Sequence, residues 1–397
     1  AEHFMDQDPI AIVAARRTPM GSFQGELGTV SAPELSATAN RAALSDSGLD
    51  AAAIDEVLLG CVLPAGLGQA PARQAALSAG LPVGVPCTTI NKVCGSGMKA
   101  ALLGHDLIKA GSAEIVLAGG MESMSNAPFL MPNARSGYRM GHQKVLDHMF
   151  FDGLQNPYDG NMMGHFAELT AEKYGLTREE QDTFAIESVT RARAAAAAGK
   201  FAQEIAPVTV RNRKGDLIVS EDEGPRVANI EKIPTLRPAF KKDGTVTAAS
   251  SSSISDGAAS LILMRTSAAV ANNTPRLASV VGQSGYAHQP EWFTTAPVFA
   301  IQALHKKLGW DAKSVDLYEI NEAFACVTMA AMRDVGIAHE KVNVNGGACA
   351  LGHPIGASGA RIIVTLVHAL RNRGGGKGIA SLCIGGGEAV AIGIEVK

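Results

Sequence analysis

The chain has 397 residues, of which 46% are hydrophobic, 18% charged and 5% aromatic, and its formal net charge is −3 at pH 7. A chain of this length is usually divided between two or more packed units. The small negative charge and the few aromatic residues argue against nucleic acid and against an anionic membrane as partners, because the field of the whole molecule would attract neither.

The cysteines argue against a metal site. None of the six forms a Cys-x-x-Cys pair, so we predict neither a zinc site nor a redox pair, and reduced thiols fit a cytosol-like compartment. No apolar run reaches the ~18 residues of a membrane helix. The opening AEHFMDQDP is unlike a secretory signal or a transit peptide. We expect a cytoplasmic protein, with a mature organellar form as the alternative.

The first elements alternate between strand and helix. The pattern predicts a strand at 10–14, then a helix with a capping box formed by Ser31 and Glu34 and a stop at Gly48, then a buried strand that ends near Gly60. Such alternation is typical of βαβ units with a mostly parallel sheet.

The stretch TTINKVCGSGMKAALLGHDLIKAG begins at Thr88 and predicts a strand that includes Ile90 and Val93, a tight turn, and a helix that ends at Gly111. Cys94 falls at the strand-to-helix junction. The unpaired amides and the positive dipole end of a helix favour a thiolate, so this cysteine is predicted to be acidic and nucleophilic. The alternative is an inert buried thiol.

The composition and the periodicity change in the middle of the chain. After a strand that runs into Gly119 and Gly120, the residues from Ser123 onward are rich in Met, Asn, Gly and Pro and show no sustained period. Loops this long are usually binding surfaces or covers. A helix then starts with a capping box at Thr177 and Glu180.

Two further elements lead back to a regular pattern. A helix stop at Gly199 is followed by an exposed hairpin around 214–215 and by an apolar strand at 261–264.

Three short units recur later in the same order. The aligned pairs are Asp55 with Asp316, Ser96 with Ser358, and Gly119 with Gly386. Such an ordered recurrence predicts two copies of one βαβ-rich domain, with the region 123–251 inserted between their main bodies.

Equivalent strand ends of two packed copies can converge on one site. The first copy offers Cys94, and the second offers Asn321, His353 in a glycine-rich loop, and Cys383 before three glycines, 385–387, whose amides are suited to hold an anion. The alternatives are a structural cap for Asn321, a hydrogen-bonded loop histidine for His353 and a buried strand cysteine for Cys383. Together, two thiols, an imidazole base and an oxyanion hole suit acyl transfer with carbon–carbon bond making or breaking.

The strings NKVCGSGMKA, NEAFA, NVNGGACALGHPIGASGAR and LCIGGG resemble those of the thiolase family, in particular its acetyl-CoA acetyltransferase members. The similarity covers nearly the whole chain, including GGMESMSNAP, DGTVTA and SDGAA.

The resemblance implies an α/β fold with the duplicated αβαβα five-layer architecture and an inserted loop domain. The N-terminal half would be 1–122, completed by about 252–270. The loop domain, 123–251, would cover the active site, and the C-terminal half would be 271–397. A homodimer or a homotetramer built as a dimer of dimers is implied as well.

The resemblance also implies roles for residues. Cys94 matches the acylated nucleophile, His353 the base that activates it, and Cys383 the second acid and base. Asn321, through a water and together with the imidazole, would form one oxyanion hole. The backbone amides of Cys94 and Gly385 would form the other.

The implied reaction is ping-pong. Two acetyl-CoA give acetoacetyl-CoA and CoA, or a short-chain 3-oxoacyl-CoA is cleaved by CoA, through an acyl-cysteine. The alternative is a thiolase for longer 3-oxoacyl-CoA in fatty-acid β-oxidation. A ketoacyl-type condensing synthase would lack the second cysteine, and a silent acyl-CoA carrier would not need all four positions. No tightly bound cofactor is implied, since CoA and acetyl-CoA are substrates.

The substrate-binding residues implied by the resemblance are Ser252, Met163, Arg226, Phe324 and Phe293. The chain departs from the family pattern nearby, with Ser250 in place of an asparagine and Met162 in place of a histidine. Phe293 stands where a methionine often lines the acyl pocket. Arg226 matches an arginine near the CoA adenine, although the local spacing differs.

Overall fold

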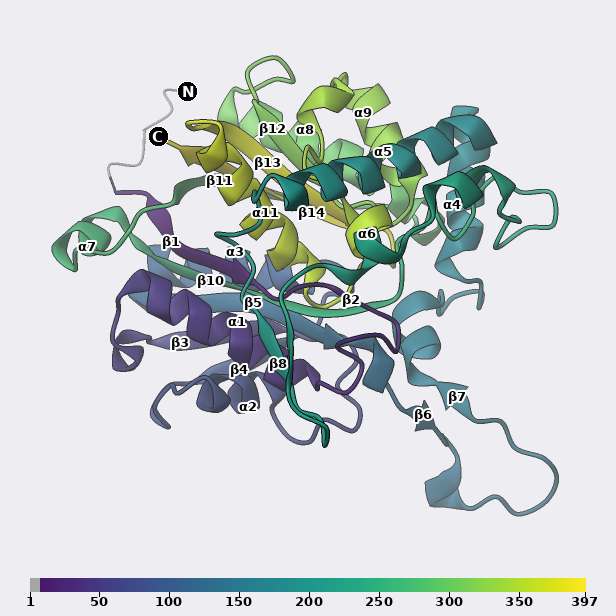
Figure 1. The fold of residues 1–397 in the computed structure, drawn as a ribbon, viewed down its shortest axis with the longest axis horizontal. Helices are drawn as coiled ribbons and strands as arrows, with labels where there is room; N and C mark the ends of the chain where they lie inside the picture. The colour runs from purple at the N-terminus through teal and green to yellow at the C-terminus, as the bar shows by residue number, and fades with distance from the viewer. Residues whose placement is uncertain (1–7) are drawn as a thin grey trace.

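The structure is a computed structural model that describes residues 8–397. The first seven residues, on which the prediction about the start of the chain rests, lie outside the described part. Within that part the elements stack in five layers, helix, sheet, helix, sheet, helix (Figure 1). The predicted duplicated α/β architecture is confirmed.

The sheet of the N-terminal half runs in the order β4-β3-β5-β10-β1. The strands are β4 (Cys87–Ile90), β3 (Glu56–Gly60), β5 (Ile115–Ser123), β10 (Ser255–Arg265) and β1 (Ile10–Arg17). β3 is parallel to β4 and β5, and β10 is antiparallel to β5 and β1. The short β2 (Gly21–Ser22) pairs with β10. β10 belongs to this sheet although it follows the inserted region 123–251 in the sequence.

The sheet of the C-terminal half repeats that order. It runs β12-β13-β14-β11, with β12 (Leu317–Ile320), β13 (Gly376–Ile384), β14 (Glu388–Val396) and β11 (Ala278–Ala287). Val342 forms a parallel bridge to Tyr318 of β12, on the side where β4 stands in the first half. β1 and β11 pair with each other and join the halves. The prediction of a mostly parallel sheet is wrong, because β1, β10, β11 and β14 pair antiparallel with their neighbours.

Matching aspartates support the repeat at atomic detail. Asp55 accepts the backbone N–H groups of Glu114 and Ile115, each at 2.8 Å, at the start of β5. Asp316 accepts the N–H of Lys377 at 2.8 Å in β13. The first strand of each half also carries a bulge at the same place, one between Ile12 and Ala14 and the other between Val280 and Gly282.

Strand register corrects one predicted pair. Leu59 and Ile320 each lie four residues after the matching aspartate, and they pair with Gly119 and Ser381. Gly119 therefore corresponds to Ser381, and Gly386 lies beyond the strand. The predicted correspondence of Gly119 with Gly386 is therefore wrong. Both copies contain adjacent glycines, but those of the first copy lie inside β5 and those of the second copy lie after β13.

The glycine pair of β5 lies inside the strand and does not end it. A Cβ at Gly119 would lie 2.1 Å from the Ala259 oxygen, and a Cβ at Gly120 would lie 2.0 Å from the Gly356 oxygen. Both positions need glycine because neighbouring backbone approaches closely.

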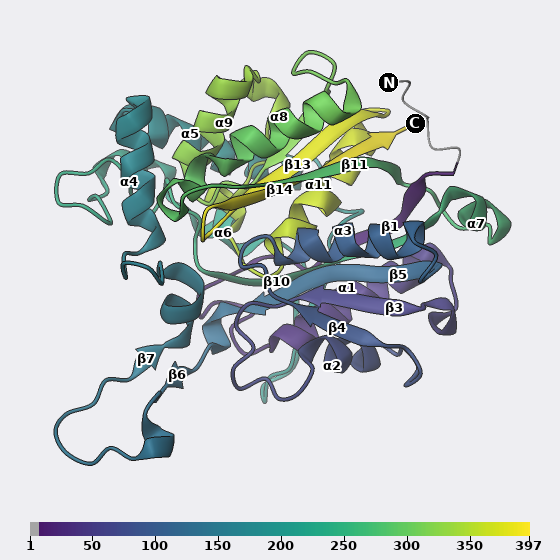
Figure 2. The same ribbon diagram turned by 180° about the vertical axis from the view of Figure 1, so that it is seen from behind.

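Helices cover both outer faces and fill the middle (Figures 1 and 2). α1 (Ala32–Ser47) and α2 (Pro71–Ser78) cover the N-terminal sheet, and α8 (Ala296–Leu308) and α9 (Ala325–Val335) cover the C-terminal sheet. α3 (Ser96–Lys109) and α11 (Ser358–Asn372) pack together between the sheets. Every residue of α11 from 358 to 370 is buried, as a central layer requires.

The two central helices approach each other through reciprocal glycines. A Cβ at Gly97 would lie 2.8 Å from the Ala360 nitrogen, and a Cβ at Gly359 would lie 2.3 Å from the Met98 nitrogen. Each glycine thus packs on the residue that follows its counterpart, which is the arrangement expected where a pseudo-twofold axis passes between the helices.

The inserted region contains more regular structure than predicted. It includes β6 (Phe129–Leu130), β7 (Leu146–Asp147), α4 (Met163–Tyr174), α5 (Arg178–Ala197), β8 (Val208–Val210), β9 (Leu217–Val219) and α6 (Glu223–Val227). α4 was not predicted, because its first residue follows Met162, which offers no side-chain cap. The capping boxes of α1 and α5 and the hairpin of β8 and β9 are confirmed.

The division into domains at 122, 251 and 270 stays a prediction. Between residues 8 and 397, no helix is both long and apolar enough to cross a membrane.

Candidate active site

The predicted nucleophile lies on a strained turn between β4 and α3. Val93, directly before Cys94, has φ +47°, a value that β-branched residues rarely adopt. The turn is held by the Asn91 side chain, which accepts the Val93 N–H at 2.9 Å, and by the Ser96 hydroxyl, which accepts the Lys92 N–H at 2.8 Å. The expectation that Val93 belongs to the strand is wrong, because β4 ends at Ile90.

The Cys94 thiol is not intrinsically acidic, contrary to the prediction. Burial raises its pKa to about 11, while the backbone N–H of Gly385 acts in the opposite direction. Desolvation of the thiolate therefore outweighs the effect of the helix start. At neutral pH this cysteine is a thiol that needs a base.

The second cysteine lies close to the first. Cys383 is fully buried in β13. Burial raises the pKa of its thiol, and the neighbouring Cys94 raises it further. A Cβ on Gly95 would lie 2.4 Å from the Ile384 side chain, so the end of β13 packs directly on the nucleophile turn. The structure thus brings Cys94, Cys383 and Gly385 together.

His353 lies between α10 (Ala348–Leu351) and α11. Its Nδ1 is hydrogen-bonded to the Ser358 hydroxyl, which in turn donates to the Pro354 oxygen at 3.0 Å. A hydroxyl has one proton, so Ser358 accepts from the imidazole and the proton of the ring is on Nδ1. Nε2 then carries the free electron pair.

The free nitrogen of His353 is suited to accept a proton. Nε2 is buried and has no hydrogen-bond partner among the residues that the structure describes. Burial lowers the pKa of the imidazole to about 3, and the charge of Arg361 acts in the same direction. Ile355, two residues further on, belongs to an apolar cluster against which Cys94 packs. The base and the nucleophile therefore share one neighbourhood.

Asn321 follows β12 and is buried. Its N–H donates to the Ser381 oxygen at 3.0 Å, but neither polar atom of its side chain has a partner within the described part of the chain. The side chain is therefore not a structural cap. A buried amide without partners costs on the order of 1–3 kcal/mol, so the site is built for a ligand or a water at this position.

Two buried glutamates near the site were missed by the sequence analysis. Glu322 accepts from the Ser188 hydroxyl at 2.6 Å and the Asn343 amide at 2.8 Å, and it supports the chain directly after Asn321. Glu122 accepts the N–H of Gly356 at 2.9 Å. Their position inside the NEAFA and GGMES strings was the available signal, but charged residues are usually exposed.

Three of the predicted substrate-binding residues lie in or against an apolar cluster around the second thiol. Cys383, Phe293 and Phe324 are buried in this cluster, and Met163 packs against it. The Phe293 ring meets that of Phe166 edge-on, with the ring centroids 6.2 Å apart. Met162 directly precedes α4.

Of the residues predicted to contact CoA, Ser252 lies next to this cluster through Ala323, whereas Arg226 lies on a separate helix. The N–H and the hydroxyl of Ser252 both donate to the Ala323 oxygen at 2.9 Å, and Ser250 is buried, where its hydroxyl accepts the Thr247 N–H. Arg226 lies on α6, and its guanidinium is paired with Glu26 at 2.6 Å. The guanidinium also lies 3.6 Å from Glu221, and no contact between Arg226 and either cysteine is found among the described residues.

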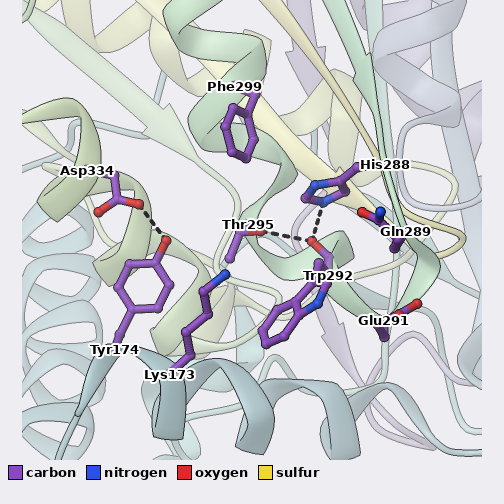
Figure 3. Close-up of a pocket in the computed structure, with 9 residues that line it drawn as sticks. All are labelled: Lys173, Tyr174, His288, Gln289, Glu291, Trp292, Thr295, Phe299 and Asp334. Atoms are coloured by element: carbon purple, nitrogen blue, oxygen red, sulfur yellow. Dashed lines mark hydrogen bonds between the residues drawn. The ribbon is translucent and has the colours of Figure 1, made fainter.

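The cavity shown in Figure 3 has a volume of about 660 Å³. Its lining residues are Lys173, Tyr174, His288, Gln289, Glu291, Trp292, Thr295, Phe299 and Asp334. Trp292 faces it, whereas the next residue, Phe293, belongs to the cluster around Cys383. The segment Pro290–Thr295 forms part of its wall, and none of the predicted catalytic residues lines it.

Among residues 8–397, no three His, Cys, Asp or Glu side chains are grouped so that they could hold a metal ion.

Two models of known protein families match this chain, one after the other along the sequence. The family model for the thiolase N-terminal domain matches residues 10–267, and that for the thiolase C-terminal domain matches residues 274–396.

Individual relatives cover almost the whole chain. A protein from Pseudomonas aeruginosa named acetyl-CoA acetyltransferase is 52% identical over 96% of this chain and 98% of its own length. Acetyl-CoA acetyltransferase 2 from Arabidopsis thaliana is 49% identical over 98% and 97%. The crystal structure of the Bacillus anthracis acetyl-CoA acetyltransferase is similar with a TM-score of 0.96 and 41% identity, covering 98% of this chain and 99% of that one.

Proposed function

Because the chain belongs to the thiolase family, we propose that its acyl transfer runs through a thioester on Cys94. The protein is an acyltransferase that acts on CoA thioesters, joining two acetyl-CoA to acetoacetyl-CoA or cleaving a short 3-oxoacyl-CoA with CoA. A preference for long chains is not favoured, because the relatives are named for acetyl-CoA. The observation that carries the proposal is the buried, neutral His353, whose Nε2 has no partner in the described structure and lies in the neighbourhood of a thiol with a pKa of about 11.

In the first half-reaction, Nε2 of His353 takes the proton of Cys94 as the sulfur attacks the thioester carbonyl. The amides of Cys94 and Gly385 hold the oxyanion that forms. The tetrahedral intermediate then collapses, the CoA sulfur leaves and takes up the proton, and an acyl-cysteine remains. Losing one oxyanion donor is expected to slow this step by roughly 10²- to 10³-fold.

In the second half-reaction, Cys383 first gives its proton to the neutral His353, and the resulting thiolate takes a proton from the methyl group of the second acetyl-CoA. Acylation of Cys94 prepares this step, because it removes the ionisable neighbour that raises the pKa of Cys383. Asn321, through a water and beside His353, holds the enolate oxygen. The enolate carbon attacks the acyl group, the bond to the Cys94 sulfur breaks, and that sulfur takes back the proton held by His353, which returns all three groups to their starting state.

The acyl chain would lie against the aromatic cluster around Cys383. Phe293 is only 2% exposed and its ring packs against Phe166, which supports a short acyl pocket. We keep Ser252 as a contact of the pantetheine arm, Met163 and Phe324 as further contacts of the CoA thioester, and Arg226 as a contact near the adenine.

A homo-oligomer is supported by the long hairpin that carries β6 and β7. Figure 1 shows it protruding from the body of the molecule. Along it, Phe129 is 67% exposed, Met140 is 92% exposed and Val145 is 55% exposed. Apolar side chains gathered on a protruding segment are typical of a protein interface. The cytoplasmic location and the lack of a tightly bound cofactor stay predictions.

Intact-protein mass spectrometry after exposure to acetyl-CoA tests the mechanism. We expect one acetyl group on wild-type protein, located on Cys94 by peptide mapping. Cys383→Ala should still be acetylated but should not exchange the methyl protons of acetyl-CoA with solvent. A label on another residue, or normal exchange in Cys383→Ala, would overturn the assignments.

A further inference from the structure

The turn that carries the imidazole belongs to the C-terminal half but is inserted into the N-terminal half. The carbonyl oxygen of Gly356 is surrounded there by glycines. A Cβ on Gly120 would lie 2.0 Å from this oxygen, one on Gly60 2.8 Å, and one on Gly97 3.0 Å. These three glycines form a socket that only a bare backbone can line.

A buried carboxylate holds the same peptide from its other side. Oε1 of Glu122 accepts the N–H of Gly356 and the N–H of Val62, both at 2.9 Å. Oε2 accepts the N–H of Leu63 at 3.1 Å and faces the Cys61 sulfur at 3.4 Å. Glu122 has no exposed surface, and no salt bridge to it is found in the described part of the chain.

The surroundings of Glu122 match an ionised carboxylate. All its partners are donors, three amides and one thiol, and hydrogen bonds from backbone N–H groups to a carboxylate are stronger than those between neutral groups. Burial raises the pKa of this carboxyl to about 7, and the amides of Val62, Leu63 and Gly356 act in the opposite direction. The carboxylate therefore joins two loops of the first half to the turn of the second.

The turn that Glu122 holds at Gly356 is the same turn that positions the His353 imidazole. The N–H groups of Ala357 and Ser358 both donate to the Pro354 oxygen, at 2.9 and 3.0 Å, so the turn from His353 to Ser358 is one closed unit. Ser358 fixes the imidazole from within this unit, and the Glu122 contact at Gly356 fixes the unit to the half that carries Cys94.

We propose that Glu122 is a positioning residue for the general base: its carboxylate locks the His353 turn onto the N-terminal half and so keeps Nε2 aimed at the Cys94 thiol. This inference rests on the proposed function, in which His353 deprotonates Cys94. Glu122 itself touches no reacting atom.

The first test is Glu122→Gln. The amide offers one acceptor where two are needed and points an NH₂ group at donors. We expect kcat for acetoacetyl-CoA formation to fall by about 10- to 100-fold, as a displacement near 1 Å would produce, with KM for acetyl-CoA within about twofold. Glu122→Asp keeps the charge and should recover part of the rate. Glu114→Gln, an exposed glutamate just before β5, is the matched control and should behave as wild type.

The second test is a double-mutant cycle on single-turnover acetylation of Cys94, followed by mass spectrometry. If Glu122 acts through the base, Glu122→Gln slows acetylation in wild type but changes it by less than about threefold in a His353→Asn background. An equal loss in both backgrounds, or a loss in KM alone, would overturn the inference and leave Glu122 a merely structural residue.

Failure of the proposed function gives a different result. If His353→Asn alone acetylates Cys94 at the wild-type rate, the base assignment is wrong whatever Glu122 does. Thermal unfolding of each variant shows whether it is folded. Should Glu122→Gln not fold, Glu122→Asp replaces it in the same cycle, with the same outcomes deciding.

Discussion

The two halves share a strand order but carry different residues at equivalent strand ends. By register, Asn321 after β12 corresponds to Gly60 at the end of β3, and Cys383 in β13 corresponds to Met121 in β5. In the C-terminal half these positions present an amide and a thiol. In the N-terminal half they present a bare backbone and a buried apolar side chain.

The starts of the central helices differ in the same way. Ser96 and Ser358 correspond, which makes Gly356 the counterpart of Cys94. The pseudo-twofold relates two equivalent places in the molecule. At the place of Cys94, which we call the open pole, polar side-chain atoms of Asn321 and His353 have no partner within the described residues. At the place of Gly356, which we call the closed pole, the Gly356 peptide fills the space beside Gly60. The size of the side chain decides which of two equivalent places becomes a reaction site and which becomes an anchor.

The largest expected effect comes from breaking the open pole. Cys94→Ala should abolish both condensation and thiolysis, by on the order of 10⁴-fold or more, as loss of a nucleophile does in other covalent enzymes. Steady-state assays in both directions measure it. Cys87→Ala, which changes a half-buried thiol in β4, should stay close to wild type. Activity of Cys94→Ala above one per cent would contradict the comparison.

Asn321→Ala sharpens the claim that the open pole holds unsatisfied polar groups. We expect kcat to fall roughly 10²-fold, because an oxyanion donor is lost. Stability should fall little, since the side chain of Asn321 makes no hydrogen bond to another described residue. Enzyme assays and thermal unfolding on the same sample check both. A large drop in unfolding temperature with unchanged kcat would assign Asn321 to the framework instead.

Gly120→Ala tests the closed pole. The added Cβ would lie 2.0 Å from the Gly356 oxygen, so we expect a loss of about 1–3 kcal/mol in unfolding free energy from overpacking, together with slower acetylation of Cys94. Gly285→Ala in β11, where the nearest atom lies 3.8 Å away, is the control. If both variants unfold alike in urea, the socket does not anchor the turn.

The smallest expected effect is on the pH dependence of stability. The folded-state pKa of His353 is about 3, below the usual value near 6.5. Below pH 6.5 the unfolded chain therefore binds a proton that the folded chain does not, and the wild type loses stability as the pH falls. His353→Asn lacks this loss, so the stability advantage of wild type over the variant should shrink between pH 7 and pH 5. Urea unfolding at both pH values measures it, and a constant difference would argue against a buried neutral imidazole.

Much of the fold was open to prediction from local patterns. The capping boxes of α1 and α5, the alternation of strand and helix and the hairpin of β8 and β9 all depend on residues close in sequence, and all are confirmed. α4 was missed because it lacks a capping side chain and owes its stability to packing against α9 and the segment before α8.

By itself the sequence determined which residue types stand at the strand ends and helix starts, and thereby the fold class and the family. Only the tertiary structure decided their chemical state. The helix start at Cys94 predicts an acidic thiol, yet burial beneath the end of β13 raises its pKa to about 11. Desolvation depends on what other segments of the chain place around a group, and no local pattern contains that information.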